Sequence, residues 1–409
     1  MTKVHPEDFE VTDFAVREHR SLWGDAWRRL ISSNTARLGL FIVILFVSSA
    51  TLSHYFWKYE PKKDLNYSLK LKAPNIRPNE EVDSIHIFGT DKLGRDIFRR
   101  VVHGGWNSLR VGIVAVGISL SIGGLIGLLT GFYESITMTT AERIILYGIT
   151  GLILGLLSAW IANQYFQLIF FLGFGIAAGY YQDLLAGKPL RMIVFGSAGL
   201  LISVIPSLFA GLTIALICGI WGILTGVLLS LPLDGKFFSN VMMRVMDMLL
   251  SFPGYLLAIA IVAFLGPGLG KGMIAIGIVG IPVYARLVRS AVLGIINKEY
   301  ILAAQAVGEP HGRILIRHIT PNILSPIIVQ TTMGLANAIL SAAALGFLGL
   351  GAIPPEPEWG AMLGDSYRYL TSGAWWAVLF PGLAIMLSVL GFNLLGDGLR
   401  DALDPKLRM

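Results

Sequence analysis

The stretch PNILSPIIVQTTMGLANAILSAAALGFLGLGAIPP, Pro321 to Pro355, contains no Asp, Glu, Lys or Arg. The same is true of Met192 to Leu233 and of Thr371 to Gly396. A helix of about 20 apolar residues crosses the hydrocarbon core of a bilayer, and a helix satisfies its own backbone hydrogen bonds there. These stretches are too long, and alternate too rarely, for the strands of a membrane barrel. They therefore predict an all-α, polytopic membrane protein.

The overall composition agrees with a chain that is mostly embedded in lipid. Of the 409 residues, 54% are hydrophobic and 14% are charged, and the mean hydropathy is +0.67. Soluble domains carry about a quarter charged residues. The formal net charge of +6 is assigned to cytoplasmic loops, so no nucleic-acid partner is expected. The single cysteine, Cys218, excludes an intrachain disulfide.

Ten apolar segments are predicted to cross the membrane. Their bounds are Leu38–Trp57, Ser108–Tyr133, Ile144–Ala162, Gln167–Tyr181, Met192–Ala210, Leu212–Leu231, Met246–Leu265, Met273–Val292, Ile323–Leu350 and Trp375–Leu395. The first segment follows about 37 mostly polar residues that include five arginines, which is unlike a cleavable signal peptide. The sequence therefore predicts a retained first span with the N-terminus in the cytoplasm.

Ten spans would place both termini in the cytoplasm, with residues 58–107 and 352–374 outside. Lys188 and Arg191 then fall on the cytoplasmic side, as the positive-inside rule requires. However, 11 Lys and Arg residues lie in the outer segment between Lys58 and Arg110, which the rule does not favour. The distribution of charge alone therefore leaves the orientation open.

The chain carries no recognisable ATP-binding loop. The nearest string is GPGLGKG, Gly266 to Gly272, in which Gly272 replaces the Ser or Thr that must follow the lysine, and Leu265 occupies the position of the first required glycine. It is interpreted as a turn between spans. No polar segment is long enough for a soluble enzyme domain. We therefore expect no catalytic residue, metal or cofactor in this chain, and any ATP would be used by partner subunits.

One polar segment has the pattern of a surface helix. Its sequence is EYILAAQAVGEPHGRILIRHITPN, Glu299 to Asn322, and it lies between two apolar segments. One apolar helix face is predicted for residues spaced i, i+3, i+4 and i+7, which are Tyr300, Ala303, Ala304 and Val307.

A turn and a second helix follow this face. Gly308 and Pro310 are expected to break the first helix. A second short helix is then predicted to end at Pro321, and it carries Arg313, Arg317 and His318. This arrangement is either an element that docks on a partner or a loop that lies on lipid headgroups, with its basic residues on phosphate.

The segment resembles the EAA loop of ABC importer permeases, which docks on the ATPase subunit. Residues at the family's spacing are Ala303, Ala304, Gly308 and Pro321. Two positions depart from it, because Leu302 stands where the family often has Glu, and Thr320 where Leu is usual. The resemblance implies that the ATPase-coupling residues are Glu299, Tyr300, Ala303, Ala304, Val307, Gly308, Arg313 and Pro321.

Four further motifs resemble the "C" type permeases of dipeptide, oligopeptide and nickel importers. They are GTDKLGRDIFRRVVHGGWNSLRVG (Gly89–Gly112), MMRVMDMLLSFPG (Met242–Gly254), GFLGLGAIPPEPEWGAML (Gly346–Leu363) and FNLLGDGLRDALDPKLR (Phe392–Arg408). The resemblance covers about three-quarters of the chain in the family's order. It implies a type I ABC importer permease core of about six spans in the bacterial cytoplasmic (inner) membrane.

The resemblance also implies a function and partners. The chain would form half of the channel of an ATP-driven, binding-protein-dependent importer of peptides or similar small solutes. Its partners would be a homologous sister permease, ATP-binding subunits, an extracytoplasmic solute-binding protein and membrane lipid.

About 100 residues interrupt the resemblance, from Ile136 to Gly235, and they contain four of the apolar segments. Four crossings return the chain to the same side of the membrane. The family core is complete without this inserted block, so we expect it at the periphery. The predicted regions are 1–60 (tail and first span), 61–107 (extracytoplasmic), 108–135 (core span), 136–235 (inserted block) and 236–409 (core with the coupling loop 293–322).

Glycines at spacings of four suggest close helix packing. Such residues are Gly123, Gly127 and Gly131 in the second span, and Gly151, Gly155, Gly222 and Gly226 in the inserted block. The pattern is common in membrane helices, so ordinary packing is the simpler interpretation.

Charged residues near span ends have two readings. Arg244, Asp247, Arg286 and Arg289 are either functional intramembrane charges or side chains that extend to the headgroups. Asp91, Arg95 and Asp96 either contact a docked binding protein or cap the helix that follows, and capping is favoured.

Two other functions would require features that the sequence lacks. An ion-coupled transporter needs carboxylates or histidines at the bilayer midplane, and the late spans have none. An intramembrane enzyme needs a nucleophile with a base, or a metal motif such as HExxH, and no HExxH occurs in the sequence.

Overall fold

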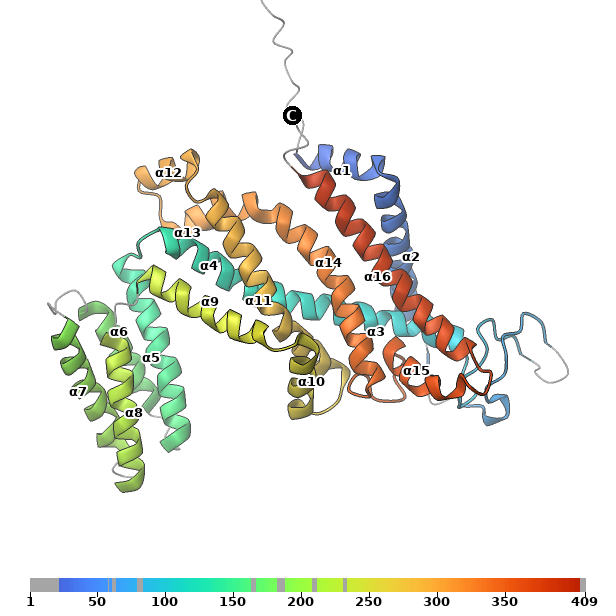
Figure 1. Cartoon of the computed structure of the whole chain (residues 1–409), viewed down its shortest axis with the longest axis horizontal. Helices are drawn as coiled ribbons and strands as arrows, with labels where there is room; N and C mark the ends of the chain where they lie inside the picture. The colour runs from blue at the N-terminus through green and yellow to red at the C-terminus, as the bar shows by residue number, and fades with distance from the viewer. Residues whose placement is uncertain are drawn as a thin grey trace, which may run out of the picture.

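The computed structural model describes residues 22–57, 59–60, 64–78, 84–162, 167–181, 188–207, 212–230 and 234–404. Across this part of the chain the secondary structure is helical, apart from two isolated bridges, Asn75–His86 and Thr90–Asp96 (Figure 1). Five helical segments are long and apolar enough to cross a bilayer, and a sixth results if one bent helix pair is counted as a span. The all-α membrane architecture is therefore confirmed at this level, while the exact number of spans stays a prediction.

The helices fall into a core and an inserted block. The long core helices are α2 (Asn34–Phe56), α3 (Ile97–Ile118), α4 (Gly124–Ser135), α9 (Gly235–Ser251), α10 (Gly254–Leu265), α11 (Leu269–Ile295), α14 (Thr320–Phe347) and α16 (Trp376–Leu403). Shorter core helices are α1 (Leu22–Ser32), α12 (Glu299–Ala306), α13 (His311–Arg313) and α15 (Trp359–Ser366). The block consists of α5 (Thr140–Ala162), α6 (Gln167–Tyr181), α7 (Lys188–Ser207) and α8 (Leu212–Ser230).

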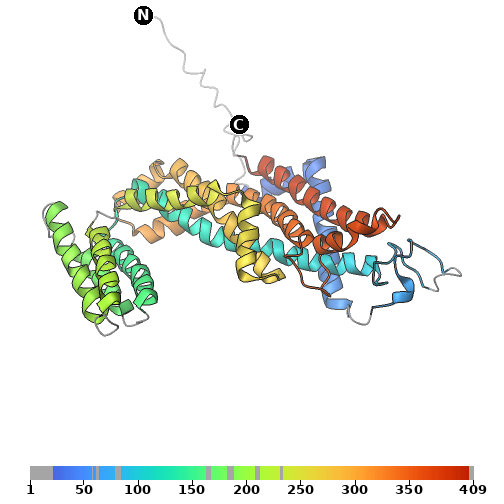
Figure 2. The ribbon, with the colours of Figure 1, turned by 60° about the horizontal axis from the view of Figure 1, so that its bottom comes forward.

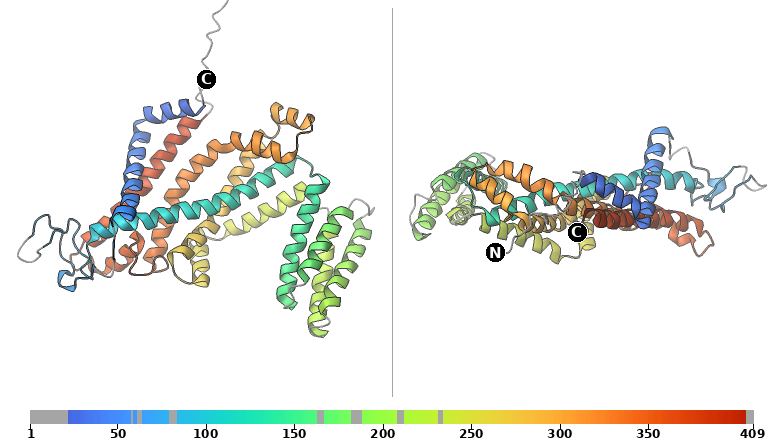
Figure 3. Two further views of the ribbon diagram at one scale, coloured as in Figure 1. Left: turned by 180° about the vertical axis from the view of Figure 1, so that it is seen from behind. Right: turned by 90° about the horizontal axis from the view of Figure 1, so that it is seen from above.

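The core is built around one long helix. A π-helical turn, Ser119–Gly123, joins α3 to α4 without a break, so 39 residues form a single helical segment. This segment runs through the whole length of the core, and α2, α11 and α14 cross it (Figures 2 and 3). Three apolar clusters follow one another along it, around Ile97 to Leu109, Val111 to Val116 and Phe132. Both α11 and α14 pack against this segment and against each other.

The glycines of this helix lie at its closest approach to α11. A β-carbon at Gly123 would lie 2.3 Å from the carbonyl oxygen of Ile281, and one at Gly127 would lie 2.4 Å from that of Ala285. At Gly131 it would meet the side chain of Val292 at 2.8 Å. All three glycines therefore face α11, where any side chain would push the two helices apart.

The inserted block is a four-helix bundle beside the ends of α4 and α9, at one end of the molecule (Figure 1). It contains two tightly packed hairpins, α5 with α6 and α7 with α8. Small residues line both: Gly151 meets Gly175, and Gly199 meets Gly222. Large apolar side chains cover the outside of the bundle, among them Ile145, Ile153, Ile169, Ile193, Leu216 and Ile220. Such a surface suits lipid, but whether all four helices cross the membrane stays a prediction.

The predicted span Met246–Leu265 is not a single helix. The chain instead forms α9 and α10, which meet at 91°. Proline disfavours a helical conformation for the residue before it, and Phe252 is accordingly extended, with φ −83° and ψ 137°. Pro253 then precedes the first residue of α10. The pair is a broken span or a re-entrant hairpin.

Two short helices were not predicted. The first, α1, packs Ala26 and Leu30 against Ala402 at the end of α16. The second, α15, follows Glu358 in the segment expected outside the membrane, and it buries Trp359 against Phe46. Both helices lie in mostly polar segments, where a short apolar face was not recognised from the sequence.

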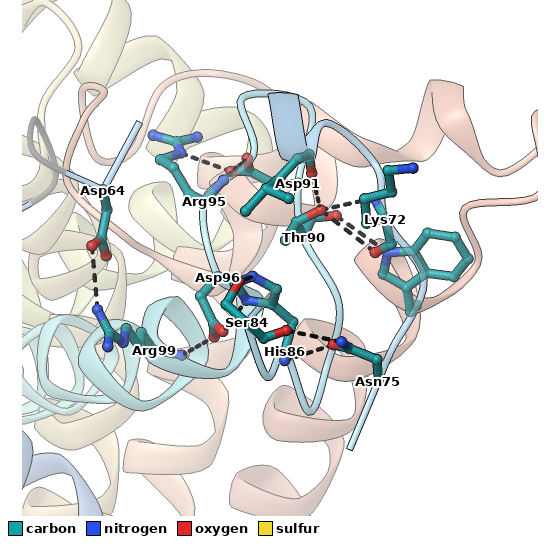
Figure 4. Close-up of polar contacts among 12 residues, drawn as sticks. Asp64, Lys72, Asn75, Ser84, His86, Thr90, Asp91, Arg95, Asp96 and Arg99 are labelled. Carbon is teal, nitrogen blue, oxygen red and sulfur yellow. Dashed lines mark hydrogen bonds and ion pairs between the residues drawn. The ribbon is translucent and has the colours of Figure 1, made fainter. Parts of the chain in front are cut away.

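The segment before α3 is held by buried ion pairs (Figure 4). Asp91 is paired with Arg95 at 2.7 Å and with Arg100, and all three side chains are buried. Burial alone would raise the pKa of Asp91, but Arg100 and Arg95 outweigh it and hold that pKa below its usual value. These residues therefore shape the segment, and they are not exposed to a docked protein.

Asp96 caps α3, as favoured from the sequence. Its Oδ1 accepts a hydrogen bond from the backbone N–H of Arg99 at 3.0 Å, and its Oδ2 accepts one from Nδ1 of His86 at 2.7 Å (Figure 4). Lys92 joins this segment to the one that contains α15, through a 2.7 Å ion pair with Asp365.

Three of the charges near the span ends, Asp247, Arg286 and Arg289, are paired between helices. Arg286 on α11 lies 2.5 Å from Asp247 on α9, and Arg289 lies 2.5 Å from Glu134 on α4. Neither interpretation from the sequence, functional intramembrane charges or side chains that extend to the headgroups, included this pairing. The paired residues are 39 and 155 positions apart along the chain.

Candidate functional site

The predicted coupling loop projects from the end of the bundle where α1 and the C-terminal end of α16 also lie (Figure 1). Its first helix, α12, is anchored by Ile301, which is fully buried. Ile301 packs in one apolar cluster with Val292 at the end of α11 and with Ile314 and Ile319 beyond the turn. The loop is therefore fixed to both α11 and α14.

The opposite side of α12 is exposed. Tyr300 is 40% exposed, Val307 is 87% exposed, and Ala303 lies between them on the surface. The predicted apolar face therefore exists, but most of it points outward, and only Ala304 packs against the buried cluster. An apolar helix face that its own chain leaves uncovered is typical of a surface that binds something else. Glu299 lies in the first turn of α12, where its charge favours the helix dipole.

The turn after α12 is a Schellman motif. Gly308 has φ +77°, its N–H donates to the carbonyl of Gln305 at 2.9 Å, and the N–H of Glu309 donates to that of Ala304 at 3.1 Å. Positive φ is easy only for glycine. Nothing lies within 4 Å of a β-carbon built at Gly308, so a side chain there would project into open space.

Glu309 ties the turn to the second half of the loop. Its Oε2 lies 2.7 Å from Nε2 of His318, and its Oε1 lies 3.7 Å from Nε of Arg313. The side chain of Arg313 is otherwise mostly exposed, and Arg317 is exposed as well. The basic residues therefore gather after the turn, and α12 carries none.

The prediction that the second helix ends at Pro321 is wrong. Residues from His311 to Phe347 form one helical segment, in which a π-helical turn, Ile314–Ile319, precedes α14. Proline lacks the N–H that would continue an α-helical ladder. The wider π turn lies directly before Pro321 in the first turn of α14, so the helix passes the proline without a break.

A second candidate site is a cavity of about 190 Å³ between α3, α11 and α14, which is mostly apolar but has polar side chains in its lining. Its polar lining consists of Ser119, Tyr284, Gln330, Asn337 and Ser341. The last three lie on one face of α14, at i, i+7 and i+11. These residues were not predicted from the sequence, although two amide side chains seven residues apart in an uncharged span are a visible signal.

Asn337 is exposed on the surface of the single chain, in the middle of α14. An amide facing hydrocarbon leaves its hydrogen-bonding groups unpaired, which is costly. This face of α14 is therefore better suited to water, a solute or a partner chain than to lipid. Among the described residues no cluster of His, Cys, Asp or Glu is arranged to hold a metal ion.

Comparison with known proteins places the chain among transport proteins. Residues 221–409 match the family described as binding-protein-dependent transport system inner membrane component. Residues 21–74 match the N-terminal TM domain of oligopeptide transport permease C.

Three relatives show the extent of the similarity. A dipeptide transport system permease protein of Alkalihalophilus pseudofirmus is 36% identical over 388 residues, which cover 95% of this chain and 91% of the relative. A di/tripeptide transport system permease protein of Pseudomonas aeruginosa is 35% identical over 382 residues, 93% of this chain and 91% of the relative. The dipeptide transport system permease protein of Escherichia coli K12 is 53% identical over 168 residues, 41% of this chain and 56% of the relative. The last figure gives that relative a length of about 300 residues.

Proposed function

Because this chain belongs to the family of binding-protein-dependent transport system inner membrane components, we propose that it forms half of a solute channel and couples to a separate ATPase through α12. The chain is a multi-pass permease subunit of the inner membrane. The names of its relatives specify dipeptides, di- and tripeptides, and glutathione. We therefore assign peptides or similar small solutes as its substrates.

The proposed assembly contains a homologous sister permease, ATP-binding subunits and an extracytoplasmic solute-binding protein. The ATP-binding subunits would use the ATP, and this chain would perform no covalent chemistry. We assign the loop 299–322 to the cytoplasm. It lies at the same end of the bundle as α1 and the end of α16 (Figure 1). The segment around Asp91 and the helix α15 would then face the binding protein from the other side.

One observation carries the assignment of α12 as the docking helix: its exposed face is apolar and has no basic residue. Tyr300, Ala303 and Val307 form this face, and a fixed turn holds it away from the bundle. A loop that rests on anionic headgroups would turn Lys or Arg toward them. Here Arg313 and Arg317 lie after the turn, and Lys298 lies before the first residue of α12, so the helix itself is better suited to a protein surface than to lipid phosphate.

The anchoring of α12 suggests how its movement reaches the channel. Closure of the ATPase subunits would displace α12, and the buried Ile301 would carry that displacement to α11 and α14 through Val292 and Ile319. The same two helices form most of the cavity that Gln330 and Asn337 line. Movement at the loop would therefore change the spacing of the cavity walls.

We assign the polar face of α14 to the wall of the translocation path. Gln330, Asn337 and Ser341 offer neutral hydrogen-bond donors and acceptors. Such groups can pair with the amides that all peptides share, and they do not select for one side-chain charge. Weak pairing of this kind suits a path that must release its solute.

A charge placed on the docking face tests the function. Ala303→Asp puts an unpaired carboxylate on the surface that is proposed to pack against the ATPase, so ATPase binding and solute uptake should both be lost. Leu302→Glu is the matched control, because it adds the same charge one residue away, at an exposed position where the resembling permeases often have Glu. Co-purification of the ATPase subunits and uptake in proteoliposomes are the measurements. Equal behaviour of the two variants would contradict docking through this face.

A further inference from the structure

The inserted block touches the coupling loop at one defined point. Glu142, in the first turn of α5, accepts a hydrogen bond from Nδ1 of His311, with distances of 2.9 Å to Oε1 and 3.0 Å to Oε2. His311 is the first residue of α13, directly after the turn at Gly308. In Figure 1 the upper end of α5 lies next to α13 and the end of α4. Glu142 of the block is thus hydrogen-bonded to His311 of the loop, which lies 169 residues later in the chain.

Both partners in this contact are held in place. The N–H of Thr139 donates to Oε2 of Glu142 at 2.8 Å, while the N–H of Glu142 donates to Oγ1 of Thr139 at 3.3 Å, which is a reciprocal cap on α5. The ring of His311 packs edge-on against Phe132 of α4, with 5.3 Å between ring centroids. The contact therefore links two fixed groups.

The electrostatics favour an ionised Glu142. Burial alone would raise its pKa, but hydrogen bonds from Thr139, Tyr133 and His311 outweigh burial and hold the pKa below its usual value. A carboxylate accepts from an imidazole N–H more strongly than a neutral group does.

The two ends of the block join the core in one place. A β-carbon at Gly235 would lie 2.0 Å from the carbonyl oxygen of Tyr133, so the start of α9 touches the end of α4. Asp234 caps α9 through the N–H of Phe237 at 2.7 Å. The end of α4 and the start of α9 are therefore in contact without the block. A direct link between these two helices would leave the packing of the core unchanged. The Escherichia coli relative, about 100 residues shorter than this chain, has no comparable length for such a block.

We propose that Glu142 is a positioning residue for the coupling loop, through which the inserted block holds α13 against the end of α4. This inference rests on the proposed role of the loop in ATPase coupling. The contact would make the second half of the loop and the end of α4 move together when α12 is displaced. Without it, the ATPase would still bind to α12, but part of its movement would be lost within the loop.

The test uses the complete transporter, with its sister permease, ATPase subunits and binding protein, in proteoliposomes. ATP hydrolysed per solute imported should rise roughly fivefold in Glu142→Ala and in His311→Ala, the shift that loss of an ordinary hydrogen bond produces. The double variant should be no worse than either single one, because both remove the same contact. Glu142→Gln, which keeps an oxygen for His311, should lie between Glu142→Ala and the wild type.

Thr139→Ala is the matched control, because it removes the hydroxyl half of the cap on α5 and leaves the contact with His311 in place. It should keep the normal ratio of ATP to solute. A normal ratio in Glu142→Ala, or an equal rise in Thr139→Ala, would overturn the positioning role. ATPase co-purification is measured in parallel. If Ala303→Asp still co-purifies with the ATPase subunits, docking through α12 is contradicted instead. The failure of the docking proposal can therefore be told apart from the failure of the positioning role of Glu142.

Discussion

Glu358 is the residue whose environment is most unusual for its charge. Its side chain is 1% exposed, and it caps α15 by accepting hydrogen bonds from the N–H groups of Gly360 and Ala361, both at 2.8 Å. Burial raises its pKa to about 7, and those two hydrogen bonds offset only part of the effect. The carboxyl should therefore gain and lose its proton near neutral pH, in the segment that the proposed topology puts on the side opposite the ATPase.

A raised pKa in an acid makes stability fall as pH rises. Between the usual value of 4.5 and about 7, the folded protein binds more protons at Glu358 than the unfolded chain does. The free energy of unfolding should therefore decrease by up to about 1.4 kcal/mol per pH unit in this window, and level off above it. Glu358→Gln mimics the protonated acid, so it should flatten this slope. Thermal unfolding of both proteins in detergent from pH 5 to 8 measures the difference, and identical slopes would contradict the assignment.

Single residues also show where local sequence rules succeed. The order Gly308, Glu309, Pro310 predicted the turn, and the positive φ at Gly308 agrees with it. The buried anchor Ile301 was not predicted, because the spacing pattern assigned Tyr300, Ala303, Ala304 and Val307 to the apolar face and left out Ile301. Its burial depends on Ile314, beyond the turn, and periodicity within one helix cannot report a partner outside it.

Among the elements, α14 joins the loop to the cavity that we propose as part of the solute path. It continues from the coupling loop through the π-helical turn, and its middle carries the polar face that lines the cavity. The apolar composition of Pro321 to Pro355 identified the span. The start of the helix was misjudged, because the usual effect of proline does not include a preceding π turn. The break between α9 and α10 is a different error. There Pro253 does interrupt the helix, although the apolar run around it had been predicted as one span.

The polar face of α14 makes a prediction at the same scale. Gln330→Leu and Asn337→Leu remove hydrogen-bonding groups from the proposed path, so each should lower uptake about tenfold, as expected when roughly 1.4 kcal/mol of favourable interaction is lost. Assembly and ATPase binding should not change. Thr332→Val is the control, because Thr332 lies on the same helix outside the cavity lining and bonds only to the backbone of Ile328 in the described contacts. Normal uptake in both leucine variants would remove α14 from the path.

At the scale of the whole molecule, long motifs predicted more than single elements did. The motif order predicted the permease family, and the relatives and family matches confirm it. The inserted block lies beside the core, at one end, as its place between two core segments suggested (Figure 1). Its contact with the loop through Glu142 was not predictable, because nothing in the sequence pairs that residue with His311. Contacts between distant segments require the folded chain.

The central claim is that α12 docks on the ATPase, and Gly308→Arg tests it most directly. A side chain at positive φ costs on the order of 1 kcal/mol, which is too little to prevent folding, and the arginine would project from the docking surface. Gly308→Asn tolerates this backbone and adds little bulk. Gly294→Arg adds the same charge at an exposed glycine near the end of α11, before α12, where nothing lies within 4 Å of a β-carbon.

The measurement is co-purification of the ATPase subunits with each permease variant, alongside uptake. Gly308→Arg should insert in the membrane and pair with its sister permease, but it should lose the ATPase and stop uptake. Gly294→Arg and Gly308→Asn should keep both. Full ATPase recovery and normal uptake with Gly308→Arg would contradict the account, and the loop would then be a segment that rests on lipid.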